Sequence, residues 1–400
     1  MRRVVITGTG TINALGHDVP STCAAFADSK DGIGALDIPD VDRLSIRVAG
    51  QVRDWTGTDH FDLRGLSLYD RMTQFCLWSA RQAVAQSGLV FDEALSLRAG
   101  VVLGTAGGGL GTIDDSYRAV YAEGKNRVHP LTVPRLMASA GVSHISMTYG
   151  LRGPAFTVST ACASSNHAMG LAFQMIRSGA TPVMLTGGAE AMLTFGGLKA
   201  WEGLRVMAAD ACRPFSADRT GMVQGEGAAV FVFEEYDHAR ARGAEILAEV
   251  AGFAMCSDAH DIVMPSVDGA VRAMRGALAD AGISAGQVGY INAHGTGTKA
   301  NDINESAAIQ TVFGATPPLV SSTKGAHGHI IGGTGAVEAL ACLMALRDGI
   351  IAPTLGYQKP DPDCALDVVP NTARAARVEV AISNAFAFGG LNAVLVLRRV

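Results

Sequence analysis

Charged and aromatic residues are both scarce in this 400-residue chain. Asp, Glu, Lys and Arg together make up 17% and Phe, Trp and Tyr 6%, whereas charged residues are about 25% of an average globular protein. The formal net charge is −5, so the chain lacks the basic field that binding to nucleic-acid phosphates requires. We therefore expect no nucleic-acid partner, and a compact α/β protein with much of its surface buried, as in an oligomer.

Paired cysteines and long apolar runs are missing as well. The seven cysteines occur singly, without a Cys-x-x-Cys pair or a zinc-type spacing, which suits a reducing compartment. No stretch approaches the ~18 consecutive apolar residues of a membrane span. The chain enters a strand-like run at Val4 without the apolar region and cleavage site of a signal peptide. These absences predict a cytoplasmic protein with no membrane span.

Short β-branched runs alternate with longer Ala/Leu/Met segments at helical spacing, which is typical of α/β proteins. The pattern occurs twice. Residues 83–89 and 277–283 each end a predicted helix that leads to a strand and a glycine turn. Residues 159–178 and 325–348 each begin with a small-residue loop that opens a long apolar helix. We infer two duplicated halves with a boundary near residue 250.

The glycine-rich stretch 107–111 follows a predicted strand and raises the possibility of a dinucleotide-binding fold. Its spacing is not G-x-G-x-x-G, no acidic residue stands ~20 positions further on at a strand end, and the chain has no G-x-x-x-x-G-K-[ST] motif. A close crossing of two backbone segments accounts better for these glycines, and we expect no nucleotide site.

Cys162 is the candidate nucleophile. It follows a strand rich in Val, Thr and Phe, and we predict that it lies in the first turn of a helix. There the helix dipole would lower the pKa of the thiol and increase its thiolate fraction. Small neighbours leave room for a substrate carbonyl, whereas we expect the other six cysteines to be ordinary structural thiols.

Two histidines occupy comparable turns. His294 follows a strand in the segment Asn292–Thr298, whose threonines offer hydroxyl groups to a polar substrate arm, and His329 directly precedes the second long apolar helix. With Cys162 they predict a Cys-His-His site. His327 and His329 could instead form a metal pair, but no carboxylate or third histidine is near in the sequence, so no metal site is predicted.

These motifs resemble the β-ketoacyl-acyl carrier protein synthases, specifically the elongating type II members of the condensing-enzyme group, over essentially the whole chain. Further matching segments are Val4–Gly10, Gly150–Pro154, Gly187–Glu190, Arg213–Ser216, Gly225–Ala228 and Ser383–Gly390. Within the family, the segments Lys199–Glu202 and Asn292–Asp302 are similar to nodulation E type synthases. The resemblance implies a homodimer with a thiolase-like α/β fold of five α-β-α-β-α layers, built from two pseudo-twofold halves, residues 1–250 and 251–400.

The resemblance also implies catalytic roles. Cys162 would take the acyl chain from an acyl carrier protein as a thioester. His294 and His329 would hydrogen-bond the carbonyl of malonyl-acyl carrier protein and stabilise the enolate that forms as CO2 leaves. Lys324 would be a buried charge that orients His329, with Glu305 as its counter-ion. The product would be a 3-oxoacyl chain two carbons longer.

Other assignments from the resemblance concern substrate binding. The amides of Cys162 and Phe388 would form the oxyanion hole of the acyl thioester, and Phe388 would be the gate before the acyl pocket. Thr296 and Thr298 would contact the phosphopantetheine arm, which the carrier protein supplies, so that the enzyme needs no cofactor of its own. The acyl pocket would contain Gly107, Thr132 and Phe386, and the docking surface for the carrier protein would contain Arg64, Lys125, Arg127 and Arg205. Ala387 and Leu391 depart from the family's usual gate-loop residues.

Two other activities remain as alternatives. A noncatalytic partner subunit, such as a chain length factor, would share the fold but lack the nucleophile. A thiolase or an initiating synthase would carry Cys-His-Cys or Cys-His-Asn in place of Cys-His-His. The pathway stays open between ordinary fatty acids, a specialised polyunsaturated chain such as that of a nodulation factor, and a polyketide or aryl polyene.

Overall fold

The computed structural model describes all 400 residues, and its main feature is a mixed ten-stranded sheet in the order β10-β9-β13-β14-β8-β1-β7-β6-β4-β5. The first half of the chain supplies β1 (Val4–Asn13), β4 (Gly100–Gly104), β5 (Ala155–Val158), β6 (Val183–Glu190) and β7 (Gly227–Glu235). The second half supplies β8 (Ala248–Ser257), β9 (Tyr290–Asn292), β10 (Leu319–Ser321), β13 (Val380–Ala387) and β14 (Leu391–Arg398). Two small hairpins pair β2 (Gly34–Ala35) with β3 (Val48–Ala49) and β11 (Ile350–Ile351) with β12 (Arg374–Ala375).

The two sets of five strands have the same topology, which confirms the predicted duplication. In the first half β1 and β6 are antiparallel to β7, and β4 is parallel to β6 and β5. In the second half β8 and β13 are antiparallel to β14, and β9 is parallel to β13 and β10. The second set begins at β8, and the boundary expected near residue 250 falls within this strand. The two halves meet where Val4 of β1 pairs with Val250 of β8.

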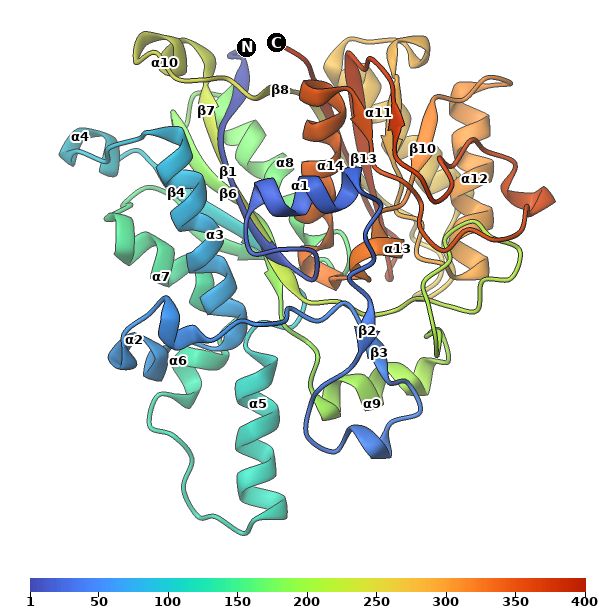
Figure 1. The fold of residues 1–400 in the computed structure, drawn as a ribbon. Helices are drawn as coiled ribbons and strands as arrows, with labels where there is room; N and C mark the ends of the chain where they lie inside the picture. Colours follow the sequence, from blue (N-terminus) through green and yellow to red (C-terminus); the bar gives the residue numbers. More distant parts are fainter.

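Helices cover and separate the two halves of the sheet (Figure 1). The helices of the first half are α1 (Val19–Ala27), α2 (Leu63–Leu68), α3 (Arg71–Ser87), α4 (Glu93–Ser96), α5 (Leu110–Tyr117), α6 (Thr132–Leu136), α7 (Ala140–Tyr149), α8 (Ser164–Arg177), α9 (Phe195–Leu204) and α10 (Tyr236–Ala241). Those of the second half are α11 (Val267–Ala281), α12 (Lys299–Phe313), α13 (Lys324–His327) and α14 (Thr334–Asp348).

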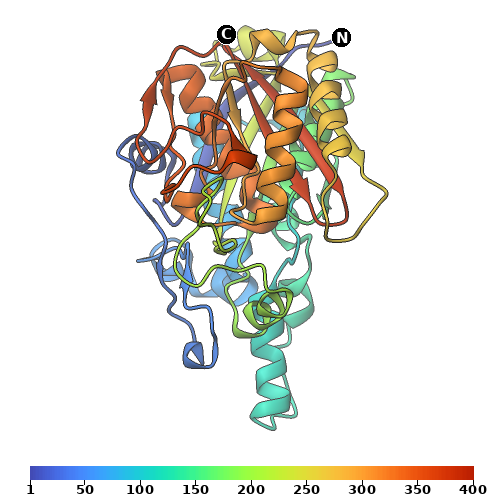
Figure 2. The same cartoon turned by 90° about the vertical axis from the view of Figure 1, so that its right-hand side faces the viewer.

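The layers follow from the faces that these helices bury. α8 and α14 contact each other and strands of both halves, so they form the central layer. α3 and α7 pack on the outer face of the first set of strands, and α11 packs on the second set and carries α12. This arrangement is the predicted five-layer α-β-α-β-α fold. Figure 2 shows the α5 segment projecting away from the layers, at the end of the molecule opposite to both termini.

The glycines at 107–111 allow a close approach of backbone segments, as the sequence analysis inferred. A Cβ atom on Gly108, whose φ is +63°, would lie 2.8 Å from the Cα of Ala138, and one on Gly109 would lie 2.4 Å from the carbonyl oxygen of Arg135. No side chain fits at such distances. The turn after β4 is thus shaped by packing against α6 and the residues that follow it.

All seven cysteines are free thiols. None of the helices combines the length and the apolar character that a bilayer crossing needs. The cytoplasmic location stays a prediction.

Candidate active site

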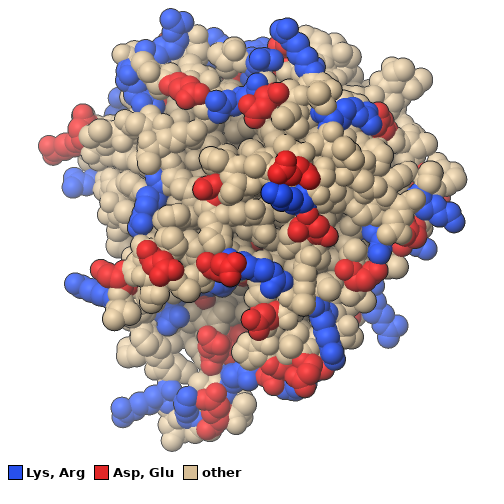
Figure 3. Space-filling model, viewed as in Figure 1, with Lys and Arg blue, Asp and Glu red and all other residues tan.

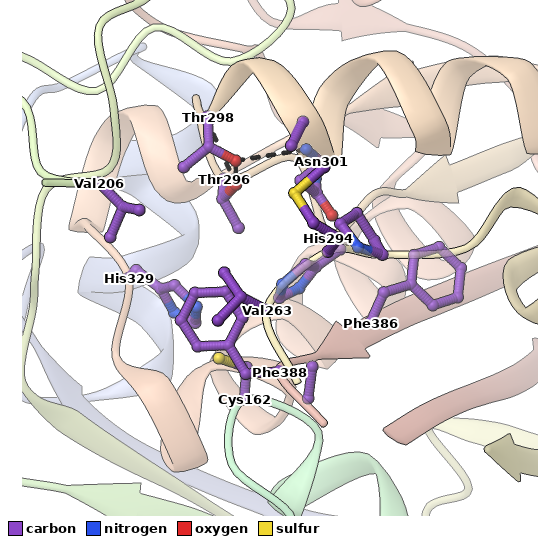
Figure 4. Close-up of a pocket in the computed structure, with 14 residues that line it drawn as sticks. Cys162, Val206, Val263, His294, Thr296, Thr298, Asn301, His329, Phe386 and Phe388 are labelled. Carbon is purple, nitrogen blue, oxygen red and sulfur yellow. Dashed lines mark hydrogen bonds between the residues drawn. The ribbon is translucent and has the colours of Figure 1, made fainter. Parts of the chain in front are cut away.

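A cavity of about 150 Å³ opens where the two halves meet. The residues that line it are Cys162, Val206, Val263, Met264, Pro265, His294, Thr296, Thr298, Ala300, Asn301, His329, Phe386, Ala387 and Phe388 (Figure 4). They come from the turns after β5 and β9, the first turn of α12, the turn before α14, the end of β13, and two loops. Carboxyl ends of strands and helix starts from both halves therefore converge on one space.

Cys162, His294 and His329 lie together at the bottom of this cavity, as predicted from their turns. The Cys162 sulfur and one ring nitrogen of each histidine all lie within 4.8 Å of one another. The two imidazole rings are 5.4 Å apart between centroids and nearly perpendicular, at 82°. All three residues are at least 95% buried, so a substrate carbonyl between them would be shielded from water.

A sharp turn presents Cys162. Ala161 has a φ of +48°, a conformation that non-glycine residues adopt rarely and that is common at functional sites. The Ser164 hydroxyl donates to the Ala161 carbonyl and accepts from the Thr160 amide, at 2.7 and 2.8 Å, which holds the turn. Helix α8 begins at Ser164. Cys162 therefore lies two residues before the helix, whereas the sequence predicts it in the first helical turn.

The prediction of a lowered thiol pKa is wrong for this structure. Burial raises the pKa of the Cys162 thiol to about 12, although the charge of Lys324 and the backbone N–H groups of Phe388 and Cys162 act in the opposite direction. Desolvation of the thiolate outweighs the helix dipole, because the sulfur is enclosed by the cavity wall. The two N–H groups that lower the pKa of the thiol are those expected to form the oxyanion hole.

His329 is held as a hydrogen-bond donor toward the cavity. Its Nδ1 accepts from the Ile331 N–H at 3.1 Å and lies 2.9 Å from the Thr334 hydroxyl. Because Nδ1 accepts a hydrogen bond from the Ile331 N–H, we assign the ring proton to Nε2, which is buried and has no partner. Burial and the charge of Lys324 lower the pKa of His329 well below 6.5, so the ring is neutral.

His294 is positioned through its backbone. Glu305 of α12 accepts from the N–H groups of His294 and Gly295, at 2.8 and 2.7 Å. The Nδ1 atom of His294 is buried without a partner. Its pKa also lies well below 6.5, because of burial and the charges of Lys324 and His329. Two neutral imidazoles therefore face the sulfur.

Lys324 has a different counter-ion from the one predicted. Its Nζ lies 2.5 Å from Oε1 of Glu338 on α14 and donates to the carbonyl oxygen of His294. Glu305 instead accepts from the amides of the His294 turn, and the ion pair of Lys324 is with Glu338. Lys324 also supports the His294 turn and makes no hydrogen bond to His329, in contrast to the orienting role expected.

The alternative of a His327 and His329 metal pair is not supported by the geometry. Both ring nitrogens of His327 are bonded within the protein, Nδ1 to the Gly328 carbonyl at 2.7 Å and Nε2 to the Thr323 hydroxyl at 2.9 Å. This histidine has no free nitrogen to offer a ligand beside His329.

The remaining predicted substrate contacts divide into two groups. Thr296, Thr298 and Phe386 line the cavity, and the two threonine hydroxyls lie 2.9 Å apart. Gly107 and Thr132 do not line it. Gly107 lies beside Glu190 and Met192, and Thr132 lies in a separate hollow beside α5. Their assignment to an acyl pocket stays a prediction.

The four basic residues expected to dock a carrier protein are all exposed but lie in different places. Arg205 is adjacent to Val206, which lines the cavity. Arg64 lies on α2, and Lys125 and Arg127 line the hollow beside α5. Basic and acidic side chains are interspersed on the face shown in Figure 3, without a field of one sign.

Sequence reasoning missed several residues of the site. Val263 and Met264 lie on a loop far from any motif, and their only sequence signal is a short apolar run, Ile262–Met264, between Asp261 and Pro265. Glu190 was quoted only as part of a motif. Its buried carboxylate accepts from the amides of Ala106 and Gly107 and from that of Gly332 near His329, and burial raises its pKa to about 7. It ties the turn after β4 to the turn after His329.

Comparisons with known proteins agree with this geometry. Residues 1–239 match the family model "Beta-ketoacyl synthase, N-terminal domain", and residues 247–358 match "Beta-ketoacyl synthase, C-terminal domain". The chain is 47% identical over 401 residues to Nodulation protein E of Rhizobium sp. (strain N33), covering 100% of both chains. It is 38% identical over 407 residues to 3-oxoacyl-[acyl-carrier-protein] synthase 2 of Staphylococcus aureus (strain COL), covering 100% of this chain and 98% of the relative.

Solved structures show the same fold. A Beta-ketoacyl synthase from Burkholderia phymatum STM815 superposes with a TM-score of 0.93 at 33% identity, covering 100% of both chains. A chain of the ishigamide ketosynthase/chain length factor superposes with a TM-score of 0.94 at 37% identity, covering 100% of this chain and 99% of that one. Ketosynthases typically use no cofactor of their own. The chain belongs to the β-ketoacyl synthase family and is a condensing enzyme of the 3-oxoacyl synthase type.

Proposed function

We propose that this enzyme condenses an acyl group held on Cys162 with malonyl-acyl carrier protein. In the first half-reaction the Cys162 sulfur attacks the acyl thioester, the carrier's sulfur leaves as a thiolate, and the proton lost by the cysteine converts that thiolate to the free thiol. The N–H groups of Cys162 and Phe388 stabilise the negative oxygen of the tetrahedral intermediate. Both N–H groups act to lower the pKa of the Cys162 thiol, so they favour negative charge at this place in the cavity, which supports this role.

The second half-reaction takes place at the two histidines. The carboxylate of the malonyl group leaves as CO2, and the electron pair moves into an enolate whose oxygen lies between His294 and His329. The enolate carbon attacks the acyl-cysteine, expels the sulfur and forms the 3-oxoacyl product. Neutral imidazoles donate hydrogen bonds to this oxygen without becoming ionised. The observation that carries the proposal is the convergence of the sulfur and both imidazoles within 4.8 Å in a buried cavity.

Acyl and malonyl groups would reach this cavity on the phosphopantetheine arm of a carrier protein. Thr296 and Thr298 line the cavity and supply hydroxyl groups for the amides of such an arm. One solved relative, superposing with a TM-score of 0.90 at 29% identity, is titled "AntDE:AntF (apo): type II PKS acyl-carrier protein in complex with its ketosynthase bound to the hexaketide". We propose that Arg205, beside the cavity, belongs to the docking surface for the acidic carrier, together with Arg64, Lys125 and Arg127.

A noncatalytic role is disfavoured by the site itself. The chain keeps the nucleophile, and it also keeps the devices that position both histidines, Glu305 below His294 and the Ile331 amide beside His329. A subunit that only shapes the product does not need a histidine whose Nε2–H group is held toward the substrate cavity. The second histidine also distinguishes this site from the Cys-His-Asn and Cys-His-Cys sites of the other alternative.

A homodimer is the assembly that we propose. Strand β5 is the free edge of the sheet and Phe156 on it is 38% exposed, whereas the opposite edge strand, β10, is bonded to Asp367. An unpaired edge with apolar side chains is a liability unless another chain covers it. Met147 is also exposed, on helix α7, which packs against β5. A twofold contact of β5 with β5 would cover both edges.

The two half-reactions test the catalytic proposal separately. Cys162→Ala should abolish acylation and keep the fold, as measured by mass spectrometry of the intact protein and by circular dichroism. His294→Ala and His329→Ala should keep most of the acyl transfer and slow CO2 release by a factor of ~10² or more, the effect of losing one oxyanion donor. Normal acylation of Cys162→Ala, or normal CO2 release by both histidine variants, would disprove the assignment.

The acyl substrate is identified by trapping. The protein is incubated with a panel of acyl-carrier proteins that differ in chain length and unsaturation, and the group on Cys162 is identified by peptide mass spectrometry. A preference for saturated medium or long chains would indicate fatty acid synthesis, and a preference for polyunsaturated or polyketide chains would indicate a specialised pathway.

A further inference from the structure

Trp201 lies against the residue that covers Cys162, and the catalytic assignment does not use it. Its indole stacks on the ring of Phe388, with centroids 6.0 Å apart and planes inclined by 25°, which is the geometry of an offset aromatic pair. Phe388 lines the cavity beside Cys162 (Figure 4), and its backbone N–H acts to lower the pKa of the Cys162 thiol. The two rings thus link the wall of the cavity to helix α9.

Helix α9 holds Trp201 firmly. At its start the Thr194 side chain accepts from the Gly197 amide at 3.1 Å. Near its end Glu202 accepts from the backbone N–H groups of Ser45 and Ile46, at 2.6 and 3.0 Å. Leu198, on the same helix, is buried in a small apolar cluster with residues of the 36–49 segment. The indole is therefore presented by an element that is fixed at both ends.

Phe388 precedes two glycines with positive φ angles. It is followed by Gly389 and Gly390, with φ angles of +82° and +65°, and glycine moves between backbone conformations at little cost. The N–H of Gly389 donates to Ile262 at 2.8 Å and that of Gly390 to Ala387 at 3.1 Å. A Cβ atom on Gly389 would meet no atom within 3.5 Å. One ring of the pair is fixed and the other lies next to a flexible pair of glycines.

We propose that Trp201 is a positioning residue that holds the Phe388 ring in its closed position beside Cys162 and so controls how often an acyl donor can reach the sulfur. The proposal rests on the proposed role of Cys162, because access matters only if this sulfur takes the acyl group. An aromatic pair stabilises one conformation beyond the area that it buries, so its loss should shift the balance between closed and open forms by about two- to tenfold.

Alkylation of Cys162 by iodoacetamide measures this access without any substrate. Trp201→Leu keeps an apolar side chain but loses the aromatic face, Trp201→Phe restores an aromatic face, and Ala200→Ser is a control at an exposed position of α9. We expect Trp201→Leu to react about two- to tenfold faster than the parent, and the other two variants to stay within about twofold. An unchanged rate in Trp201→Leu, or a rate in Trp201→Phe as high as in Trp201→Leu, would overturn the proposal.

Two controls keep the result unambiguous. Thermal unfolding shows whether each variant is folded, and Trp201→Met replaces Trp201→Leu if the latter is not. Peptide mass spectrometry confirms that the label is on Cys162 and not on one of the other six cysteines. If the acyl group from a carrier protein is found on another residue, the proposed function fails, while the alkylation rates still decide the role of Trp201.

Discussion

Removal of Glu338 should destabilise the protein more than any other single change to the buried charges around the site. The Nζ of Lys324 and Oε1 of Glu338 lie 2.5 Å apart, with side-chain exposures of 0% and 1%. At an effective dielectric constant of ~20 their attraction is ~7 kcal/mol, which offsets a desolvation cost of several kcal/mol for each ion. Glu338→Gln removes the attraction and leaves the buried ammonium, so we expect the free energy of unfolding to fall by ~3–5 kcal/mol.

Lys324→Met should cost less, because a carboxyl group can become neutral. Burial raises the pKa of Glu338 and Lys324 lowers it, so without Lys324 the native protein keeps this proton to a higher pH. The unfolded chain releases the same proton near pH ~4.5. Between these pKa values the native state binds more protons, so the stability of Lys324→Met, relative to the double variant Lys324→Met/Glu338→Gln, should fall as pH rises.

Urea unfolding followed by circular dichroism, at one fixed protein concentration, measures these differences for the parent, both single variants and the double variant. Glu379→Gln serves as the control, because the Arg377–Glu379 pair is exposed and should change stability by less than ~1 kcal/mol. A coupling energy below ~1 kcal/mol between Lys324 and Glu338 would refute the argument. The same would hold if the coupling appeared instead between Lys324 and Glu305.

Three further outcomes are expected. The rate of CO2 release should show no inflection near pH 6.5, because burial and Lys324 hold the pKa values of His294 and His329 well below 6.5; an inflection there would show that one ring ionises. Alkylation of Cys162 should keep accelerating from pH 7 to 10, since burial raises the pKa of its thiol to about 12, whereas a plateau near pH 8–9 would indicate an ordinary thiol. Gly107→Ile should crowd Met192, whose sulfur would lie 3.3 Å from the added Cβ, and should shift the preference toward shorter acyl donors. An unchanged chain-length profile in a folded variant would show that Gly107 is not part of the acyl pocket.

Local patterns in the sequence were sufficient to predict the duplicated α/β fold and the three reacting groups. β-Branched runs predict strands, and the segments of helical periodicity between them predict helices. The same order of these elements in both halves predicts the same topology. Cys162, His294 and His329 each follow a strand or precede a helix, and in α/β proteins such turns gather at one edge of the sheet. Short segments of sequence were therefore enough to predict that these three side chains lie close together.

Tertiary structure alone decided which charges and rings meet across the chain. Glu305 and Glu338 are both acidic residues on helices that approach Lys324, and no local pattern says which of them reaches it. The thiol pKa of Cys162 depends on how completely distant segments enclose the sulfur, and the contact of Trp201 with Phe388 joins residues from different halves. Periodicity and turn chemistry act over a few residues, whereas burial and pairing depend on side chains that folding brings together from remote positions.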